Sequence, residues 1–233
     1  ARLHQRVATL LEGGRDANDM KSLAAIAHHY GAALPGGDAS KALEYARIAA
    51  ERAQGLFAYE EATRLFRMAL QAWEAGNGPE PLQRGTLLAA LGESLTSAGE
   101  YLEARDTFVQ AADAVRAVRT PEAIVLFARA ALGFENASWR PGEPGSAAVR
   151  LLKEAHLELG SRDSVDGARV LSALGRALAL SGVTVEAARA SNEAIEMARR
   201  LHDNATLEMA LRMGAFVDFL EPTGLEMCIA KGE

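Results

Sequence analysis

The chain of 233 residues contains 48 alanines, is 49% hydrophobic, and carries 25 basic against 31 acidic residues for a net charge of −6. Because alanine is the strongest helix former and β-branched residues are sparse, this composition excludes a sheet-dominated fold and a disordered tail. The acidic balance does not favour nucleic-acid binding, and the single cysteine, Cys228, excludes an internal disulfide and a cysteine-rich metal site.

Prolines and glycines divide the chain into stretches with a helical period. These breakers stand at residues 35–37, 76–81, 120–121, 140–145 and 221–224. Between them, apolar residues recur at spacings of three and four, as at Leu88, Leu91 and Leu95, which is typical of one face of a helix. The pattern predicts about eleven helices and no strand, and the N-cap signals at Thr120 and Asp203 agree with its boundaries.

In chain order, we expect leading helices in residues 1–36, a repeat array over residues 37–220, and the start of a truncated further helix in residues 221–233. The array contains an irregular hairpin whose loop covers residues 134–146, where Trp139 either covers the hairpin end or contacts a partner. A helical pattern is already under way at Ala1, so we expect a piece of a longer polypeptide. No membrane span or signal peptide is evident, and we expect a cytoplasmic protein.

Two segments repeat the same spacing of small residues. Each has a glycine, a second glycine 7 residues later, and alanines 12 and 19 residues after the first glycine. The residues are Gly92, Gly99, Ala104 and Ala111 in one segment and Gly175, Gly182, Ala187 and Ala194 in the other. A third copy has Ala50, Ala62 and Ala69, with Phe57 in place of the second glycine.

The spacing has a mechanical reason. A small residue between two leucines on one helical face lets a second helix cross close to the backbone. The second glycine supplies the left-handed residue that ends the first helix, and two alanines seven apart give the returning helix close contacts of its own. Each segment is therefore a helical hairpin that must stack on its neighbours to bury its apolar stripe.

This pattern resembles the tetratricopeptide repeat, although Gly92 follows Ala50 by 42 residues, against the usual 34 of that repeat. The resemblance implies an all-α fold, a right-handed α-solenoid of tetratricopeptide-like hairpins. It also implies that the first helix of each hairpin lines a concave groove. The candidate binding residues in its groove-facing positions are Glu44, Arg47, Glu51, Gln54, Thr86, Glu93, Thr96, Arg129, Arg169, Ser172 and Arg176. The alternative is that these polar residues are only the solvated side of the helices.

A narrower resemblance covers most of the chain. The segments that carry it are Ala27-His28-His29-Tyr30, Gly37-Asp38, Lys41-Ala42, Tyr45-Ala46, Ala58-Tyr59-Glu60-Glu61-Ala62, Ala130-Ala131-Leu132-Gly133 and Arg169-Val170-Leu171. They are similar to the helical region of large actinobacterial regulators of the LuxR type, the ATP-dependent STAND proteins akin to the maltose-operon activator. In such proteins an ATPase precedes the repeats and usually a helix-turn-helix follows them.

Catalytic and metal-binding motifs are missing from the sequence. It contains no phosphate-binding Gly-x4-Gly-Lys-Ser/Thr, no Gly-x-Ser-x-Gly and no His-Glu-x-x-His. His28 and His29 point about 100° apart on a helix, so we interpret them as packing or surface residues rather than metal ligands. Trp73 is interpreted as a core residue. We predict no catalytic residue, no metal and no cofactor.

The first functional hypothesis is a non-catalytic interaction and regulatory module, the repeat segment of an ATP-dependent bacterial transcriptional regulator. Its expected partners are a protein or peptide, including other domains of the same polypeptide, without direct contact to nucleic acid or membrane. The alternative is a sensor that binds a small-molecule effector in the concave groove. A freestanding helical enzyme is a third hypothesis, for which no catalytic constellation is present.

Overall fold

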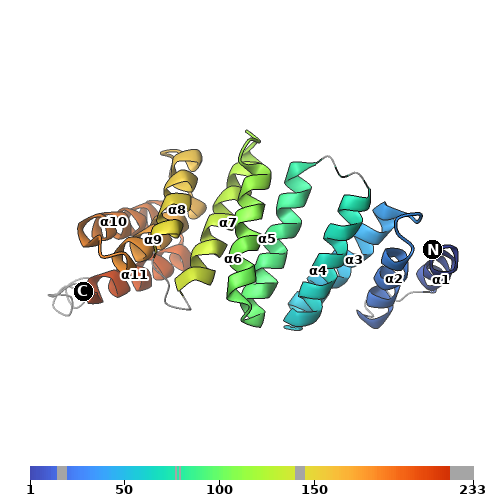
Figure 1. Ribbon diagram of the computed structural model, residues 1–233. Coiled ribbons are helices and arrows are strands. Elements are labelled where there is room, and N and C mark those ends of the chain that lie inside the picture. The colour runs from blue at the N-terminus through green and yellow to red at the C-terminus, as the bar shows by residue number, and fades with distance from the viewer. Residues whose placement is uncertain (15–19, 77, 79, 140–144, 221–233) are drawn as a thin grey trace. The chain divides into compact units, whose positions relative to one another are not determined.

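The computed structural model describes residues 1–14, 20–76, 78, 80–139 and 145–220. These residues form eleven helices and no strand, as the sequence predicts (Figure 1). The helices are α1 (Arg2–Gly13), α2 (Met20–Ala32), α3 (Ala39–Gly55), α4 (Tyr59–Ala75), α5 (Pro81–Ala98), α6 (Tyr101–Val115), α7 (Pro121–Trp139), α8 (Ser146–Leu159), α9 (Val165–Leu180), α10 (Thr184–Leu201) and α11 (Asn204–Phe219). Among the described helices, none is long and apolar enough to cross a bilayer.

Side-chain caps begin several of these helices. The Asp38 carboxylate accepts a hydrogen bond from the Lys41 amide at 3.0 Å, and Ser164 Oγ accepts one from the Gly167 amide at 3.0 Å. Each cap satisfies an amide that lacks a carbonyl partner within its helix. Thr120 and Asp203 cap α7 and α11 in the same way, so both predicted caps are confirmed.

The chain divides into two compact units, Ala1–Ala114 and Val115–Glu233, called unit 1 and unit 2 below. Within unit 1, each helix from α1 to α4 packs against the next one in sequence, and within unit 2 the same holds from α7 to α10. The first helices of successive hairpins in unit 2 also touch, α7 against α9 and α9 against α11. The predicted all-α fold of sequential hairpins is therefore confirmed, while the domain limits at residues 36 and 220 stay predictions.

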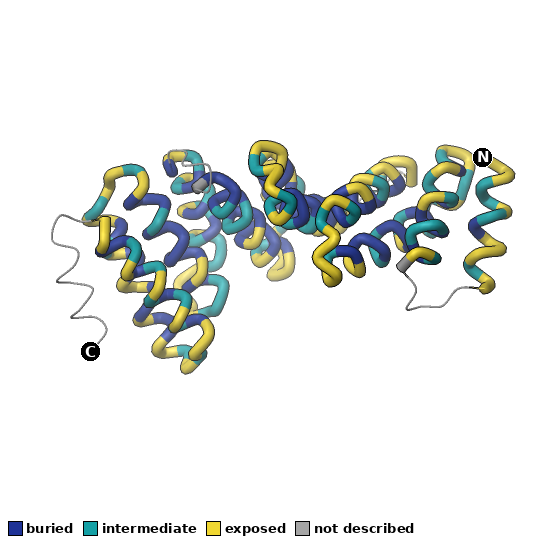
Figure 2. Tube along the Cα trace, turned by 90° about the horizontal axis from the view of Figure 1, so that it is seen from below, coloured by how far each residue is buried: buried dark blue, intermediate teal, exposed yellow. Residues whose placement is uncertain are grey.

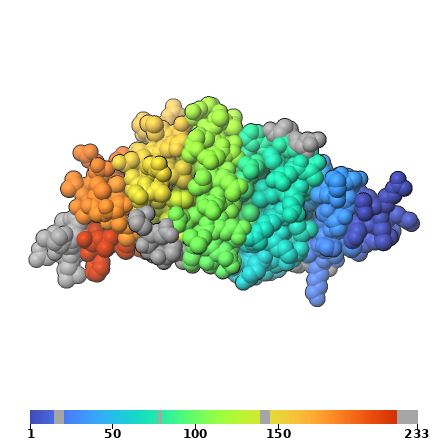
Figure 3. Space-filling view, in the orientation of Figure 1, coloured from blue at the N-terminus to red at the C-terminus, as the bar shows by residue number. Residues whose placement is uncertain are grey.

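The repeated small residues lie where helices cross. The alanines of all three copies are buried completely: Ala50, Ala62, Ala69, Ala104, Ala111, Ala187 and Ala194. Gly92 of α5 lies under the ring of Phe108 in α6, where a Cβ atom would come within 2.8 Å of the ring. A Cβ atom at Gly175 of α9 would come even closer to the Ser191 hydroxyl of α10. The buried positions therefore lie where neighbouring helices face each other (Figure 2), and side chains fill the space between these helices (Figure 3).

The turns between paired helices follow the predicted pattern. Gly99 and Gly182 both have a left-handed backbone, with φ of 87° and 77°. Phe57, which replaces the turn glycine in the third copy, has φ of 60° although its side chain is bulky. The hairpin geometry therefore requires a left-handed residue at this position whichever side chain occupies it.

The loop expected at residues 134–146 is wrong in its first part, because α7 continues to Trp139. Residues 134–139 contain neither proline nor glycine, and the Ser138 hydroxyl donates to the Phe134 carbonyl at 2.7 Å, one turn back. Ala137 is completely buried, as expected for a helical core position. Residues 140–144, the Trp139 side chain and the truncated helix expected at 221–233 lie outside the described residues.

A carboxylate in unit 1 anchors α1 to the two following helices. Glu12 accepts hydrogen bonds from the hydroxyls of Tyr30 and Tyr45, at 2.7 and 2.8 Å, and from Lys41 Nζ at 2.8 Å. The two tyrosine rings stack with their centroids 5.7 Å apart. These donors, Lys41 first, lower the pKa of Glu12 to about 2.

Candidate binding surface

The predicted groove residues all lie on first helices of hairpins. They are placed on α3 (Glu44, Arg47, Glu51 and Gln54), α5 (Thr86, Glu93 and Thr96), α7 (Arg129) and α9 (Arg169, Ser172 and Arg176). In unit 1, Gln54 Nε2 lies 3.5 Å from the Ala90 carbonyl, so α3 approaches α5 at this point. The first helices thus form a surface in each unit, and each surface contains one of the open cavities described next.

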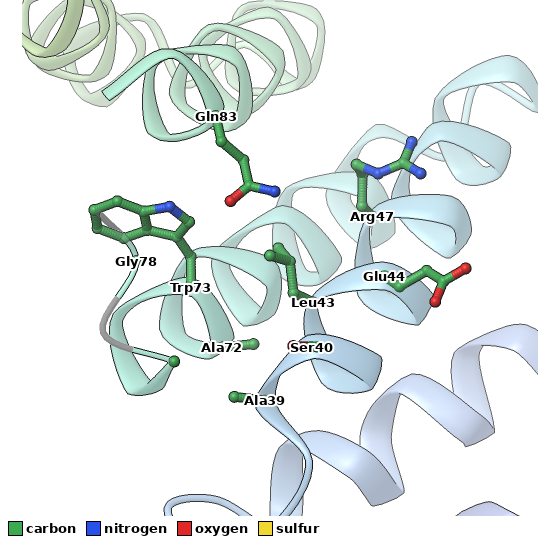
Figure 4. Close-up of a pocket in the computed structure, with 10 residues that line it drawn as sticks. Ala39, Ser40, Leu43, Glu44, Arg47, Ala72, Trp73, Gly78 and Gln83 are labelled. Carbon is green, nitrogen blue, oxygen red and sulfur yellow. The ribbon is translucent and has the colours of Figure 1, made fainter. Parts of the chain in front are cut away.

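The cavity in unit 1 has a volume of about 440 Å³ and is bounded by α3, the end of α4 and the start of α5. Of the predicted groove residues, Glu44 and Arg47 line it. Figure 4 shows these two side chains on α3, with Leu43, Trp73 and Gln83 around the same space. Glu44 and Arg47 carry opposite charges, and Arg47 is also paired with Glu51 one turn along α3, at 2.6 Å.

Trp73 forms a wall of this cavity rather than part of the core. Gly78 lies against its indole so closely that any side chain at residue 78 would overlap the ring, and the Arg84 guanidinium is 5.8 Å from the ring centroid. The indole Nε1 is buried without a hydrogen-bond partner among the described residues. Sequence reasoning missed this role, because the contact depends on where the backbone of residue 78 lies.

The cavity in unit 2 has a volume of about 330 Å³ and is lined by three consecutive first helices, α7, α9 and α11. The predicted residues Arg169, Ser172 and Arg176 all line it. The lining residues that the sequence analysis missed include Glu135, Met209, Arg212 and Met213. Three of its lining residues are therefore arginines, against one glutamate.

Glu135 and Arg176 form an ion pair at the base of this cavity. The Glu135 side chain is 2% exposed and that of Arg176 is 13% exposed. Arg176 Nε donates to Glu135 Oε1 at 2.7 Å, and Arg176 Nη2 donates to Oε2. Burial raises the pKa of Glu135, while the Arg176 guanidinium opposes this change. Arg176 is therefore held in one orientation rather than freely solvated.

Several other predicted residues make contacts within their own helices. The hydroxyls of Thr86 and Thr96 each donate to a carbonyl one turn earlier at 2.8 Å. Ser172 is buried and donates to the Ala168 carbonyl at 2.9 Å. Glu93 and Arg129 line neither of the two cavities described here. Of the predicted groove residues, Glu44 and Arg47 thus line the unit 1 cavity, and Arg169, Ser172 and Arg176 line the unit 2 cavity.

The two adjacent histidines in α2 are joined by a third from α1. The imidazoles of His4 and His29 are linked by Nδ1 atoms 2.8 Å apart, and the His28 ring lies edge-on to both. Burial and the neighbouring His28 and His4 lower the pKa of His29. Among the described residues, no group of three or more potential ligands has the arrangement that would hold a metal ion.

Comparison with known proteins identifies the fold. The nearly identical TPR-like repeats of a protein from Podospora anserina, described as a kinesin light chain, superpose with a TM-score of 0.65 and 16% identity over 81% of this chain and 93% of that chain. BtubC from P. vanneervenii superposes with a TM-score of 0.64 and 16% identity over 92% of this chain and 89% of that chain. No family model and no curated protein sequence matches. The chain has a tetratricopeptide-like repeat fold.

Proposed function

We propose that the chain is a non-catalytic interaction module that binds a segment of another protein, or of its own longer polypeptide, on the first helices of its hairpins. The proposal rests on the positions that the repeat frame assigns to the groove, because several of them line the cavities. Five groove-facing residues chosen from the repeat spacing line two open cavities. A pocket that combines apolar walls with a few convergent polar groups suits an extended peptide.

The proposed context is the cytoplasmic repeat segment of an ATP-dependent bacterial transcriptional regulator. The support is the likeness of short segments such as Ala27-His28-His29-Tyr30 and Ala58-Tyr59-Glu60-Glu61-Ala62 to that family, together with the repeat fold. The genomic sequence that surrounds this segment tests the context. A nucleotidase module upstream and a helix-turn-helix downstream are expected, and unrelated flanking domains would contradict it.

Peptide selection tests the proposed interaction. Random dodecapeptides displayed on phage are selected on the purified chain, and the affinity of enriched peptides is measured by fluorescence anisotropy. Ser40→Trp fills the unit 1 cavity from its rim, and Met209→Trp fills the unit 2 cavity. We expect one of these substitutions to weaken binding about tenfold or more.

Matched controls place the same bulky residue on second helices. Gln71 of α4 and Leu157 of α8 are exposed and line neither cavity, so Gln71→Trp and Leu157→Trp are expected to leave the affinity unchanged. Failure to enrich any peptide, or equal affinity in all four variants, would overturn the proposed function.

The second candidate is recognition of a small-molecule effector, which the cavity volumes of 330 and 440 Å³ favour. Both volumes lie within the range of pockets that hold small ligands, roughly 300–1,000 Å³. A thermal-shift screen with metabolites separates the two candidates. A specific effector raises the melting temperature once its concentration exceeds Kd, and further with the logarithm of that concentration, whereas a purely peptide-binding module does not respond.

A further inference from the structure

Helix α1 is attached to the rest of unit 1 mainly through polar side chains. His4 is linked to His29 of α2, and Gln5 Oε1 accepts a hydrogen bond at 3.3 Å from the amide of the residue that caps α3. Glu12 accepts the three hydrogen bonds described above. Ala8 is the one residue of α1 that is buried. The face of α1 that contacts α2 and α3 therefore consists largely of hydrogen-bonding groups.

The apolar residues of α1 lie on another side of the helix. Leu3, Val7, Leu10 and Leu11 follow one another at helical spacing and form a single stripe, called the α1 stripe below. At 100° per residue this stripe is turned by more than about a quarter of a turn from the contact face. Leu3 is 72% exposed and Leu10 is 77% exposed, and Figure 2 shows exposed residues along the length of α1. A surface helix normally buries its apolar stripe, whereas α1 leaves most of it uncovered.

Two arginines border the α1 stripe. Arg6 follows Leu3 by three residues and precedes Leu10 by four, and Arg2 lies one turn before Arg6. Both arginines are exposed, and neither has an ion pair among the residues that the structure describes. Glu12, the one acidic residue of α1, is occupied by its three donors on the contact face. The uncovered face is therefore apolar with a basic border, although the whole chain has a net charge of −6.

The width and charge of this face determine what fits it. A second copy fits poorly, because Arg6 lies near the middle of the stripe and a two-fold antiparallel pair of α1 helices would bring both Arg6 side chains together. A membrane surface is also less suitable, since interfacial helices turn a polar face rich in Lys and Arg to the headgroups, whereas the polar face of α1 is bonded to α2 and α3. A helix with its own apolar stripe and an acidic border matches both features.

We propose that the α1 stripe binds an amphipathic helix of another protein, whose apolar residues pack on Leu3 and Leu10 and whose acidic border lies beside Arg2 and Arg6. Apolar burial is the main source of affinity, and the charges select the partner. The stripe lies on the side of α1 away from its contacts with α3, which supplies groove positions of unit 1. The inference therefore goes beyond the proposed groove function and does not depend on it.

Selection of displayed helices on the full chain tests the inference. The library contains amphipathic helices of about 18 residues, in which the stripe positions vary among apolar residues and the bordering positions vary among Glu, Gln and Lys. We expect a class of enriched helices that has Glu rather than Lys at the bordering positions. The affinity of these helices is measured by fluorescence anisotropy.

Two matched double variants identify the surface that binds. Leu3→Gln/Leu10→Gln removes the apolar contact without changing the face that packs on unit 1 and is expected to weaken binding about tenfold or more. The control, Leu102→Gln/Val185→Gln, changes apolar residues that are 70% and 82% exposed at the starts of α6 and α10. The control is expected to keep the affinity within about twofold of the wild type.

The charged border and the groove are tested separately. Arg2→Gln/Arg6→Gln is expected to weaken binding of the Glu-bordered helices about threefold, which is the modest effect of exposed ion pairs. Ser40→Trp and Met209→Trp fill the two cavities and are expected to leave the affinity of these helices unchanged. Failure of the groove function can therefore be distinguished from failure of this inference.

Several results would overturn the inference. They are the absence of any enriched helix that binds Leu3→Gln/Leu10→Gln more weakly, equal enrichment of Glu and Lys at the border, and a lower unfolding free energy of this variant, which would mean that the stripe packs within unit 1. Self-association in sedimentation velocity that Leu3→Gln/Leu10→Gln abolishes would assign the stripe to a second copy. Binding to phosphatidylcholine vesicles with about 30% phosphatidylserine that the same variant abolishes would assign it to a membrane surface. Either result would also overturn the inference.

Discussion

Among single residues, Arg176 best shows why a groove position can be structural. The repeat frame places it on the exposed face, yet its side chain is 13% exposed and paired with the buried Glu135. Removing one partner of a buried ion pair leaves the other charge without compensation, which costs about 3–5 kcal/mol, whereas an apolar replacement of both is often neutral. Arg176→Met is therefore expected to destabilise unit 2 strongly, and Glu135→Leu/Arg176→Met is expected to recover most of the loss.

Urea unfolding followed by circular dichroism measures both variants. If Arg176→Met unfolds with the same free energy as the wild type, the ion pair contributes little to stability. A charge reversal at Arg176 is for the same reason a poor probe of binding, because it would place two carboxylates together in the core.

Gly92 provides a second test at the residue scale. A Cβ atom there would come within 2.8 Å of the Phe108 ring, and Phe108 is itself 1% exposed and has no room to move away. Gly92→Leu is therefore expected to cost about 1–3 kcal/mol or more through overpacking. The control is Gly55→Ala near the end of α3, where nothing lies within 4 Å of the added atom. Equal unfolding free energies for the two variants would show that α5 and α6 do not cross at Gly92.

The packing of the helix α1 involves several titratable groups. Its Glu12 is held by Tyr30, Tyr45 and Lys41, and its His4 shares a hydrogen bond with His29 of α2. Because the pKa of His29 is lowered in the folded state, the unfolded chain binds more protons, and stability is lost as the pH falls below about 6.5. Glu12 affects stability at lower pH. Its contribution to the free energy of unfolding is present above pH 4.5 and is lost as the pH approaches 2.

Hydrogen–deuterium exchange of residues 2–13 measures this directly. After correction for the intrinsic exchange rate, protection of α1 is expected to be lower at pH 5.5 than at pH 7.5. His4→Gln/His29→Gln is expected to remove that difference, while Glu12→Gln lowers protection at both pH values. Protection of α1 that does not change between pH 7.5 and 5.5 in the wild type would contradict the role of the histidines.

The helices and their repeat frame could be predicted because they depend on local properties. Alanine content and the 3.6-residue period determine the helices, and the positions of Gly92 and Gly175 determine where partners cross. The cavity walls could not be predicted in the same way. Arg212 and Met209 belong to α11, which lies beyond the copy of the repeat that ends at Ala194, so no frame indicated which of its faces meets α9.

Trp73 was missed for a different reason. A large aromatic side chain at the end of an amphipathic helix is more often buried in the core, whereas here the ring lies against the backbone of residue 78 and lines the cavity. Such a contact depends on the path of a loop, which the helical period does not determine. The end of α7 was placed too early for another reason, since the helix continues to Trp139, directly before the breakers at residues 140–145.

At the scale of the whole molecule, ion pairs connect neighbouring hairpins but contribute little to stability. Arg67 pairs with Glu103 at 2.6 Å and Lys153 with Glu186 at 3.0 Å between hairpins, and Arg200 pairs with Asp163 at 2.7 Å between the two ends of one hairpin. The side chains in these pairs are about a third to a half exposed, and such pairs contribute about 0–1 kcal/mol each. The buried alanines and leucines are the main source of stability instead.

The small contribution of the ion pairs and the large contribution of apolar burial predict how salts affect thermal unfolding. Sodium chloride screens the ion pairs, and it also screens the repulsion expected from the net charge of −6, so we expect a small change in melting temperature between 0.05 and about 0.5 M salt. Sodium sulfate at the same ionic strength strengthens apolar burial and is expected to raise the melting temperature clearly. Differential scanning calorimetry in the two salts makes the comparison, with sodium chloride as the control for screening. A steep fall in sodium chloride, without a gain in sulfate, would mean that the ion pairs between hairpins carry the stability of the array.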